Sequence, residues 1–364
     1  MAAYISTGDF KRGNGMYDYE KLKQNLRIFT ESELFYKDRY EALGNPEKWD
    51  CFCKKYPKES ILEKGWLCPE FFTDFTERSE FLPDDMSAYT DRDICLLQHP
   101  RYSPNVEHTH GFFEIFYVLE GSCLHTIQGR TERLPKGRLF FLAPGVRHHL
   151  EVYDNSIVIN LLIKRKTFSD IFFNTLRVQG MLTSFFLNSM YTLNHWEGLY
   201  YDIEEQEIEE LILSMLLEQL EEDSYSGGIL TSLMTIFFAK LTRRYRTGEI
   251  VSSQESPVNT RSLDMITYIN DHYQDITLQS LAKHFHYTQE YCSRLIKAAA
   301  GVSFTDVLRR IRLSRAEAFL LTTSYSIEAI SHMVGYEEPG TFIRLFKKNY
   351  GMSPGKYRLA QENL

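Results

Sequence analysis

The chain has 364 residues, of which 43% are hydrophobic and 25% charged, and its formal net charge is −8. These values are ordinary for a globular protein with room for two or three domains, and no run of about 18 apolar residues predicts a membrane span. The N-terminus lacks a basic segment followed by an apolar core, and the six cysteines form no framework, so we expect no secretory signal and a reducing, cytoplasmic location.

Residues 1–95 are rich in aromatic and charged side chains, and the segment from Tyr19 to Phe29 has helical spacing. Prolines at 46, 57, 69 and 83 divide the later part into short pieces, because proline ends or begins helices. We expect a helical N-terminal extension. Its sequence contains no chemical motif that assigns it a role.

Residues 96–165 change to the pattern of short strands. Apolar runs such as Phe112–Leu119 and Ser156–Ile163 are separated by turn signals that include Gln128-Gly129 and Pro144-Gly145. Short strands at this spacing predict a small antiparallel β-barrel or sandwich.

Four side chains of this β region are placed so that they can meet. His108, His110 and Glu114 share parity, so on an extended strand they project to one face. His148 can join them from a neighbouring strand. Three imidazoles and a carboxylate are a ligand set that suits Fe, Mn, Ni or Zn.

Residues 166–247 return to helical periodicity, with an apolar stripe along Ile208–Leu220. Such a stripe is first a core face and second a dimer seam. Residues 248–260 are polar and lack periodicity, which predicts a linker between domains.

A helix-turn-helix pattern occurs twice in residues 261–360. Thr277, Leu281 and Tyr287 recur 49 residues later as Ser326, Ile330 and Tyr336, and Arg294 and Lys297 recur 50 residues later as Arg344 and Lys347. The helix expected between the copies, Phe304 to about Leu321, is long enough to hold two recognition helices about 34 Å apart, one turn of DNA. Double-stranded DNA is therefore the leading candidate partner.

Local signals support the two copies. Thr277, Ser303 and Ser326 stand where helix N-caps are needed, and Ser303 to Asp306 predicts a capping box. Gly335 falls where the second turn needs a left-handed residue. The first copy has His286 there, one of the non-glycine residues that tolerate positive φ better than most.

The charge distribution also favours a nucleic-acid partner for this region. Residues 261–364 contain 13 Lys and Arg against 10 Asp and Glu, a net charge of +3, whereas the rest of the chain carries −11. The positive excess therefore lies where neutralisation of phosphates needs it.

Residues 263–358 resemble the DNA-binding domain of the AraC/XylS family of bacterial transcription regulators. The resemblance rests on the duplication, the spacer helix and the segment from Ile327 to Pro354, which ends in Gly-Met-Ser-Pro and is followed by Tyr357-Arg358. It implies a cytoplasmic factor whose N-terminal domain senses a signal or dimerises.

The histidine pattern resembles the motifs of cupin barrels. His108, His110 and Glu114, followed by Gly121, match the first motif, and Gly137 to His148 match the second, with Ala143 in place of its proline and Val152 in place of its asparagine. Three interpretations stay open: a functional divalent metal, a metal-free pocket for a small-molecule effector, or a structural remnant. The metal-free pocket and the structural remnant require no cofactor.

The recognition helices offer different side chains to the major groove. In the first we expect Tyr291, Leu295 and Ile296 to pack inward. Arginine can bind guanine, glutamine adenine and glutamate cytosine, while lysine meets phosphate, so we expect the first helix to carry most direct readout. The other interpretation of Arg294 and Arg344 is that each pairs with acidic neighbours on its own surface. The candidate contacts are Gln289, Glu290, Ser293, Arg294 and Lys297 in the first helix, and Gly340, Ile343, Arg344 and Lys347 in the second.

Together these patterns predict a multidomain α+β protein: a cupin-like antiparallel barrel with flanking helices, followed by an all-α domain with two helix-turn-helix units. We expect a DNA-binding transcription regulator, controlled by a sugar or related metabolite because the family most often senses these. We expect the protein to form a homodimer and, if it activates transcription, to contact RNA polymerase. We expect no membrane role and no enzyme activity. The alternatives are a metal-dependent cupin enzyme or metal sensor fused to a DNA-binding domain, or a helix-turn-helix module that binds protein.

Overall fold

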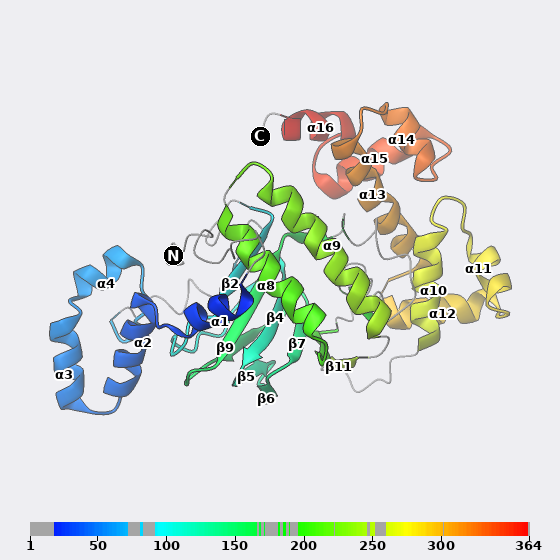
Figure 1. Cartoon of the computed structure of the whole chain (residues 1–364). Helices are drawn as coiled ribbons and strands as arrows, with labels where there is room; N and C mark the ends of the chain where they lie inside the picture. The colour runs from blue at the N-terminus through cyan, green and yellow to red at the C-terminus, as the bar shows by residue number, and fades with distance from the viewer. Residues whose placement is uncertain are drawn as a thin grey trace. The chain divides into compact units, whose positions relative to one another are not determined.

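The structure is a computed structural model that describes residues 18–71, 81–82, 92–165, 196–221, 223–245, 248–251, 260–300 and 302–362, with scattered positions between 167 and 189. The expectations for 1–17, for most of 166–195 and for 252–259 of the linker fall outside the described residues. Two compact units divide the chain, one within 1–176 and 197–253 and the other within 177–196 and 254–364. Figure 1 shows the elements of both.

Helices open the first unit, and their local sequence explains where each begins. Asp18 accepts a hydrogen bond from the backbone of Lys21, and Thr30 forms a capping box with Glu33. Pro46 supplies the first residue of the third helix, where proline costs no hydrogen bond. The bounds are α1 Tyr19–Arg27, α2 Glu31–Ala42, α3 Pro46–Lys55 and α4 Lys58–Lys64.

A buried ion pair attaches the second helix to the β region. The Arg101 guanidinium donates to both oxygens of Glu33 at 2.8 Å, and neither side chain is more than 3% exposed. Arg101 also donates to the backbone carbonyls of Arg27 and Ile28. Because every polar atom of this pair has a partner, the desolvation cost of burying two charges is offset.

Two antiparallel sheets form the β region. The larger has the order β11-β10-β7-β4-β9-β2 and the smaller β6-β5-β8, while β1 (Phe81–Leu82) pairs with β3 (Thr109–His110). Every residue of β9 is buried, as the apolar run from Ile157 predicts for a central strand. The strands are β2 Ile94–Gln98, β4 Phe113–Glu120, β5 Ser122–Ile127, β6 Arg130–Pro135, β7 Arg138–Leu142, β8 His148–Glu151, β9 Ile157–Ile163, β10 Gly198–Asp202 and β11 Glu249–Val251.

Two strands of the larger sheet come from outside residues 96–165. β10 pairs with β7, placing Tyr200 opposite Phe140, and β11 pairs with β10. The first lies in the segment with helical periodicity and the second at the start of the predicted linker. Strands of three to five residues leave too short a pattern to be recognised within a longer helical one.

Helices α8 (Gln206–Glu221) and α9 (Ser226–Arg244) pack against each other and against β2 (Figure 1). Ile208, Ile212 and Met215 of α8 are fully buried, so the apolar stripe of this helix is a core face. α1 covers α8 as well, through Tyr19 Oη to Ser214 Oγ at 2.7 Å and Lys23 Nζ to Glu209 Oε1 at 2.7 Å.

The second unit is helical in its described residues from 260 onward. Thr277 and Ser326 cap α11 and α14 as predicted, accepting from the backbone N–H of Ser280 and Ala329. The spacer α13 has 19 residues, about 28 Å of helix. The bounds are α10 Thr260–Asp271, α11 Leu278–His284, α12 Gln289–Ala300, α13 Phe304–Thr322, α14 Ile327–Met333, α15 Pro339–Tyr350 and α16 Pro354–Glu362.

The N-cap expected at Ser303 is present. Ser303 accepts from the backbone N–H of Asp306, and its hydroxyl donates to the Asp306 carboxylate. The backbone N–H of Ser303 also interacts with that carboxylate and helps to lower the pKa of Asp306. Among the described residues no helix is both long and apolar enough to cross a bilayer.

Candidate DNA interface and histidine cluster

The first recognition helix, α12, presents a polar face to solvent. Its opposite side is closed by Cys292 and Ile296, both fully buried, which fixes the rotation of the helix about its own axis. Of the predicted contacts, Ser293 is half-buried and the others are exposed: Gln289, Glu290, Arg294 and Lys297.

The entry to α12 is held by local hydrogen bonds. His286 adopts the left-handed conformation, with φ of 57°, and turns the chain into the helix. The Thr288 hydroxyl then accepts from the backbone N–H of Tyr291 at 3.2 Å, an N-cap contact that satisfies a free helix donor.

The second recognition helix, α15, is anchored by Phe342 and Phe346, both fully buried in the core of this half. All four predicted contacts are exposed: Gly340, Ile343, Arg344 and Lys347. Gly335 turns the chain before it with φ of 89°. The two helices thus present the side chains that the pattern selects.

Neither Arg294 nor Arg344 forms an ion pair with a carboxylate among the described residues. The Arg294 guanidinium instead stands 5.3 Å from the centre of the Tyr291 ring. Neither arginine is therefore held by an ion pair with an acidic neighbour among the described residues.

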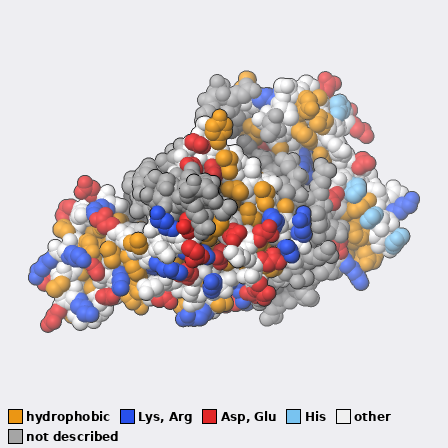
Figure 2. Space-filling model, in the orientation of Figure 1, with side chains coloured by type: hydrophobic (Ala, Val, Ile, Leu, Met, Phe, Trp, Pro, Cys, Tyr) orange, Lys and Arg blue, Asp and Glu red, His pale blue; other side chains and the backbone are white. Residues whose placement is uncertain are grey.

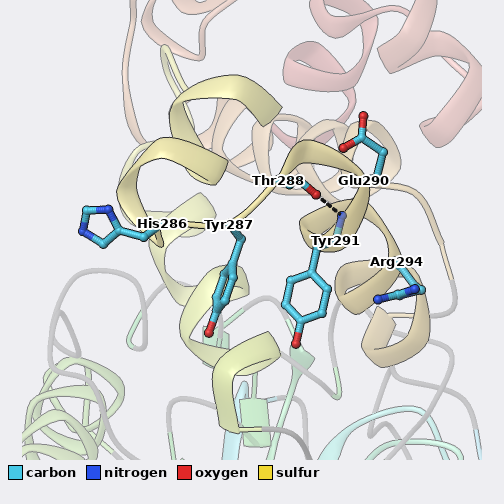
Figure 3. A pocket seen from close by; sticks show the side chains of 6 residues that line it. All are labelled: His286, Tyr287, Thr288, Glu290, Tyr291 and Arg294. Carbon is cyan, nitrogen blue, oxygen red and sulfur yellow. Dashed lines mark hydrogen bonds between the residues drawn. The ribbon is translucent and has the colours of Figure 1, made fainter.

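Tyr291 departs from its prediction, because it is partly exposed and does not fill the core; Leu295 is partly exposed too, and Cys292 takes the inward position. Tyr291 and Tyr287 lie beside each other with ring centres 4.7 Å apart. They line an open hollow of about 500 Å³ together with Arg294. Figure 3 shows both phenol groups pointing to the same side of α12.

Basic side chains gather around this helix. Figure 2 shows Lys, Arg and His side chains over the α11 and α12 region. Lys283, His286 and Lys297 are exposed there, a charge pattern suited to a polyanion.

The sensor-domain histidines meet between the two sheets. Ligand atoms of His108, His110 and His148 lie within 4.8 Å of one another. Glu114 Oε2 is 2.9 Å from His110 Nε2 and 3.4 Å from His148 Nε2. The structure therefore brings together the three side chains that parity selected and His148, which was expected to join them.

Backbone carbonyls orient two of these imidazoles. His108 Nδ1 is 3.0 Å from the Val106 oxygen, and His110 Nδ1 is 2.9 Å from the Phe112 oxygen. Each Nδ1 therefore donates to its carbonyl, and each Nε2 is directed at the centre of the cluster.

Three further polar residues join the cluster without a signal in the sequence. Asn160 donates to Glu114 Oε1 at 2.7 Å, and His125 Nε2 lies 3.4 Å from His148 Nδ1. His99 is the third; its charge interactions extend to His108 and Glu114. Asn160 and His125 come from strands β9 and β5, so only the register of the sheets brings them in.

Burial disfavours the charged form of several imidazoles in this cluster. It lowers the pKa of His99 to about 4 and that of His125 to about 3, and it holds the pKa of His148 well below its ordinary value. Burial alone would raise the pKa of Glu114, but the hydrogen bond from His110 and the nearby histidines bring it below the ordinary value.

The donor set fits a divalent transition metal. Imidazole Nε2 atoms with Nδ1 held by backbone carbonyls are the usual arrangement of metal-binding histidines, and His148 Nε2 has no hydrogen-bond partner among the described residues. His108, His110, His148 and Glu114 would hold the ion.

Two family models match the chain in the order of its units. The one described as an AraC-like ligand binding domain matches residues 95–159, and the one described as a helix-turn-helix domain matches residues 281–360. The chain belongs to the AraC/XylS family. It is a transcription regulator with a helix-turn-helix DNA-binding domain and a cupin-like ligand-binding domain.

Individual relatives match between 30% and 74% of the chain. The HTH-type transcriptional activator RhaS of Escherichia coli O139:H28 (strain E24377A / ETEC) is 25% identical over 257 residues, covering 70% of this chain and 88% of its own. The C-terminal domain of AraT, a response regulator from Geobacillus stearothermophilus, is 37% identical over 30% of this chain and 88% of that one, with a TM-score of 0.27. ToxT from Vibrio cholerae O395 is 14% identical over 74% of this chain and 98% of that one, with a TM-score of 0.31.

Proposed function

We propose that this regulator binds promoter DNA through two unequal halves, with α12 carrying most direct readout and α15 chiefly anchoring the domain. The observation that carries the proposal is the contrast between the exposed faces. α12 offers Gln289, Glu290 and Arg294, whereas the predicted contacts of α15 include one strong polar base reader, Arg344. Ile343, 38% exposed, suits a thymine methyl group.

Selection of bound sequences followed by footprinting tests this proposal. We expect a protected site of about 17–20 bp, two adjacent half-sites. Arg294→Ala should relax the preference at a defined base pair, whereas Arg344→Ala should weaken all sites more evenly. Equal loss of specificity in the two variants would contradict the division of roles, and the absence of any selected sequence would contradict DNA readout itself.

We propose that a small-molecule effector, a sugar or related metabolite, binds among His108, His110, Glu114 and His148. Four polar atoms of the cluster have no hydrogen-bond partner among the described residues: His99 Nε2, His125 Nδ1, His148 Nε2 and Asn160 Oδ1. Buried polar atoms are costly when unsatisfied, and a hydroxylated guest would supply both donors and acceptors. Calorimetric titration with a panel of sugars, against His148→Ala, tests the assignment; binding that survives the substitution would contradict it.

We propose that the protein acts as a cytoplasmic homodimer joined through α9. Tyr225, Ile229 and Ile236 are 73%, 42% and 42% exposed, and with Ser232 they follow one helical stripe. Figure 2 shows hydrophobic side chains along this helix. Asp223 precedes α9, and Arg243 lies in its last turn, so an antiparallel pair would bring opposite charges together.

Cysteine crosslinking tests both the surface and the orientation. In a Cys51→Ser background, Ser232→Cys should crosslink to itself near the two-fold axis. Tyr225→Cys should crosslink only when mixed with Ala239→Cys. Self-linking of Tyr225→Cys would indicate a parallel pair, and Ile229→Glu with Ile236→Glu should yield a monomer by sedimentation. A dimer that persists in the double variant would place the interface elsewhere.

The other partners that we propose are those of a DNA-binding regulator. We propose no enzyme activity and no membrane partner, and a contact with RNA polymerase if the protein activates transcription. Transcription in vitro from a selected promoter distinguishes activation from repression.

The second candidate is a metal-dependent function of the cluster, favoured by the mutual approach of His108, His110 and His148. Elemental analysis of the purified protein, and of His108→Ala with His110→Ala, tests it. A stoichiometric transition metal that the double variant loses, together with altered regulation, would support this candidate. Unchanged regulation without bound metal would remove it.

A further inference from the structure

We propose that Tyr287 and Tyr291 form a phosphate clamp: their hydroxyls bind one backbone phosphate at the edge of the major groove and set the depth at which α12 enters. The proposal rests on the proposed DNA-binding function. It adds two positioning residues that the motif did not select, and it names their ligand as a phosphodiester of duplex DNA.

Tyr287 and Tyr291 are arranged so that one ligand can reach both. The two rings lie 4.7 Å apart at 50°, and both line the hollow of about 500 Å³ beside α12. Figure 3 shows the phenol oxygens projecting together, while Glu290 and His286 point elsewhere. Neither hydroxyl forms a hydrogen bond to another described residue. Two free donors therefore face the same open space.

The position of Tyr291 around α12 determines which part of the DNA it can contact. Successive residues rotate by about 100°, so Tyr291 lies on the flank of the face formed by Glu290, Arg294 and Lys297. A helix about 10–12 Å wide fills a major groove about 12 Å wide. A side chain on its flank therefore meets the wall of the groove, which is the sugar-phosphate backbone, and not the base edges.

The groups beside the two tyrosines favour an anion. Tyrosine is among the side chains that hydrogen-bond phosphate oxygens, and a cation stands beside the pair: the Arg294 guanidinium, 5.3 Å from the centre of the Tyr291 ring. The Glu290 carboxylate points away from the phenol groups in Figure 3. Glu290 also lines the hollow, but the side to which the phenol groups point offers hydroxyl donors and the Arg294 cation, as an anion requires.

The second copy lacks the clamp. Tyr336, the equivalent of Tyr287, is 9% exposed and packs against Phe342. Thr341 stands 50 residues after Tyr291, the offset that relates the two recognition helices, and it has no phenol group. The clamp is therefore confined to the half that we assign to direct readout, where bidentate contacts depend most on the depth and angle of the helix.

Anisotropy titrations of the full-length protein on its selected operator test the clamp. Tyr287→Phe and Tyr291→Phe keep the rings and remove only the hydroxyls. We expect each to weaken binding about 10- to 150-fold, the value of one hydrogen bond to a charged group. The loss should be equal on operators with different bases, and the salt dependence should not change, because a neutral donor releases no counterion.

A site-specific methylphosphonate supplies the decisive comparison. At one position along the backbone the neutral phosphate should weaken binding of the unaltered protein, and there Tyr291→Phe should cost nothing more. Tyr40→Phe removes a hydroxyl from an exposed side chain of the other unit and serves as the matched control, with no expected change. Thermal unfolding checks that all variants remain folded.

The other outcomes separate the clamp from the broader function. Strong operator binding that neither substitution alters would overturn the clamp and leave DNA readout intact. A loss that depends on base identity, and that deoxyuridine or 7-deazaguanine in the operator abolishes, would also overturn it, since the tyrosines would then contact bases. Failure of the unaltered protein to bind any selected DNA would instead overturn the proposed function.

Discussion

His286 and Gly335 occupy equivalent turns of the two helix-turn-helix units, and both have positive φ, 57° and 89°. Their surroundings differ. A Cβ atom on Gly335 would collide with the backbone oxygen of Gln274 and lie 2.8 Å from Arg312, whereas His286 is exposed. Arg312 itself donates to the oxygens of Tyr273 and Gln274 at 2.8 and 2.9 Å. The second turn is therefore part of the seam that joins the two halves.

This difference predicts opposite responses to substitution. Gly335→Ala should lower the free energy of unfolding by roughly 2–5 kcal/mol, because backbone strain and overpacking add. His286→Gly should change it by less than about 1 kcal/mol, since relief of strain is offset by the greater freedom of the unfolded chain. Urea unfolding of the full chain measures both. If Gly335→Ala changed the free energy of unfolding by less than about 1 kcal/mol, Gln274 and Arg312 would have to move aside without loss of stability, which would contradict this prediction.

The buried pair of Arg101 and Glu33 predicts a large loss of stability when one partner is removed. Arg101→Ala should cost about 3–5 kcal/mol, because Glu33 is left buried without its cation. Arg27→Ala, which breaks the exposed pair with Glu120, is the matched control and should have little effect. Similar midpoints for the two variants would show that the first pair does not attach α2 to the β region.

The same pair gives a pH dependence. Burial by itself raises the pKa of Glu33, but hydrogen bonds from Arg101 and Thr30 bring it below the ordinary value. A carboxyl whose folded pKa is depressed stabilises the fold above its unfolded pKa, and this contribution is lost as pH falls. The Arg101→Ala variant should therefore lose less stability than the unaltered protein between pH 5 and pH 3, a range set by the unfolded pKa of about 4.3.

The sequence predicts best what depends on short-range periodicity. The duplication located both recognition helices, and the parity of residues 108, 110 and 114 brought three side chains to one site. What it missed depends on pairing between distant segments: His125 and Asn160 enter the cluster through strand register, and Glu33 meets Arg101 across 68 residues. Tyr291 was misplaced because periodicity marks a face as apolar without distinguishing its buried centre from its flank.

His99 predicts destabilisation in mild acid. Burial lowers its pKa to about 4 from an ordinary 6.5, so between these values the unfolded chain binds a proton that the folded protein does not. Stability should then fall as pH falls, by at most about 1.4 kcal/mol per pH unit from this residue. His99→Gln should flatten the profile from pH 6.5 to 4, whereas substitution of the exposed His332 should not. Identical profiles would assign the acid sensitivity to other groups.

Gln219 carries the last prediction. It lies in α8, and its side-chain amide bonds both backbone groups of Leu96 at 2.6 Å, accepting from the N–H and donating to the oxygen. Leu96 belongs to β2, the edge of the six-stranded sheet, where free backbone groups invite pairing with another chain.

Gln219→Ala should therefore cost about 1–3 kcal/mol, the penalty for leaving buried backbone groups unsatisfied, and should increase aggregation on heating. Gln219→Glu retains only the acceptor and should fall between alanine and the unaltered protein near neutral pH. Light scattering during thermal unfolding measures the aggregation, and urea unfolding measures the stability. If alanine and glutamate behave alike, the amide contributes through packing and not through its paired hydrogen bonds with the strand.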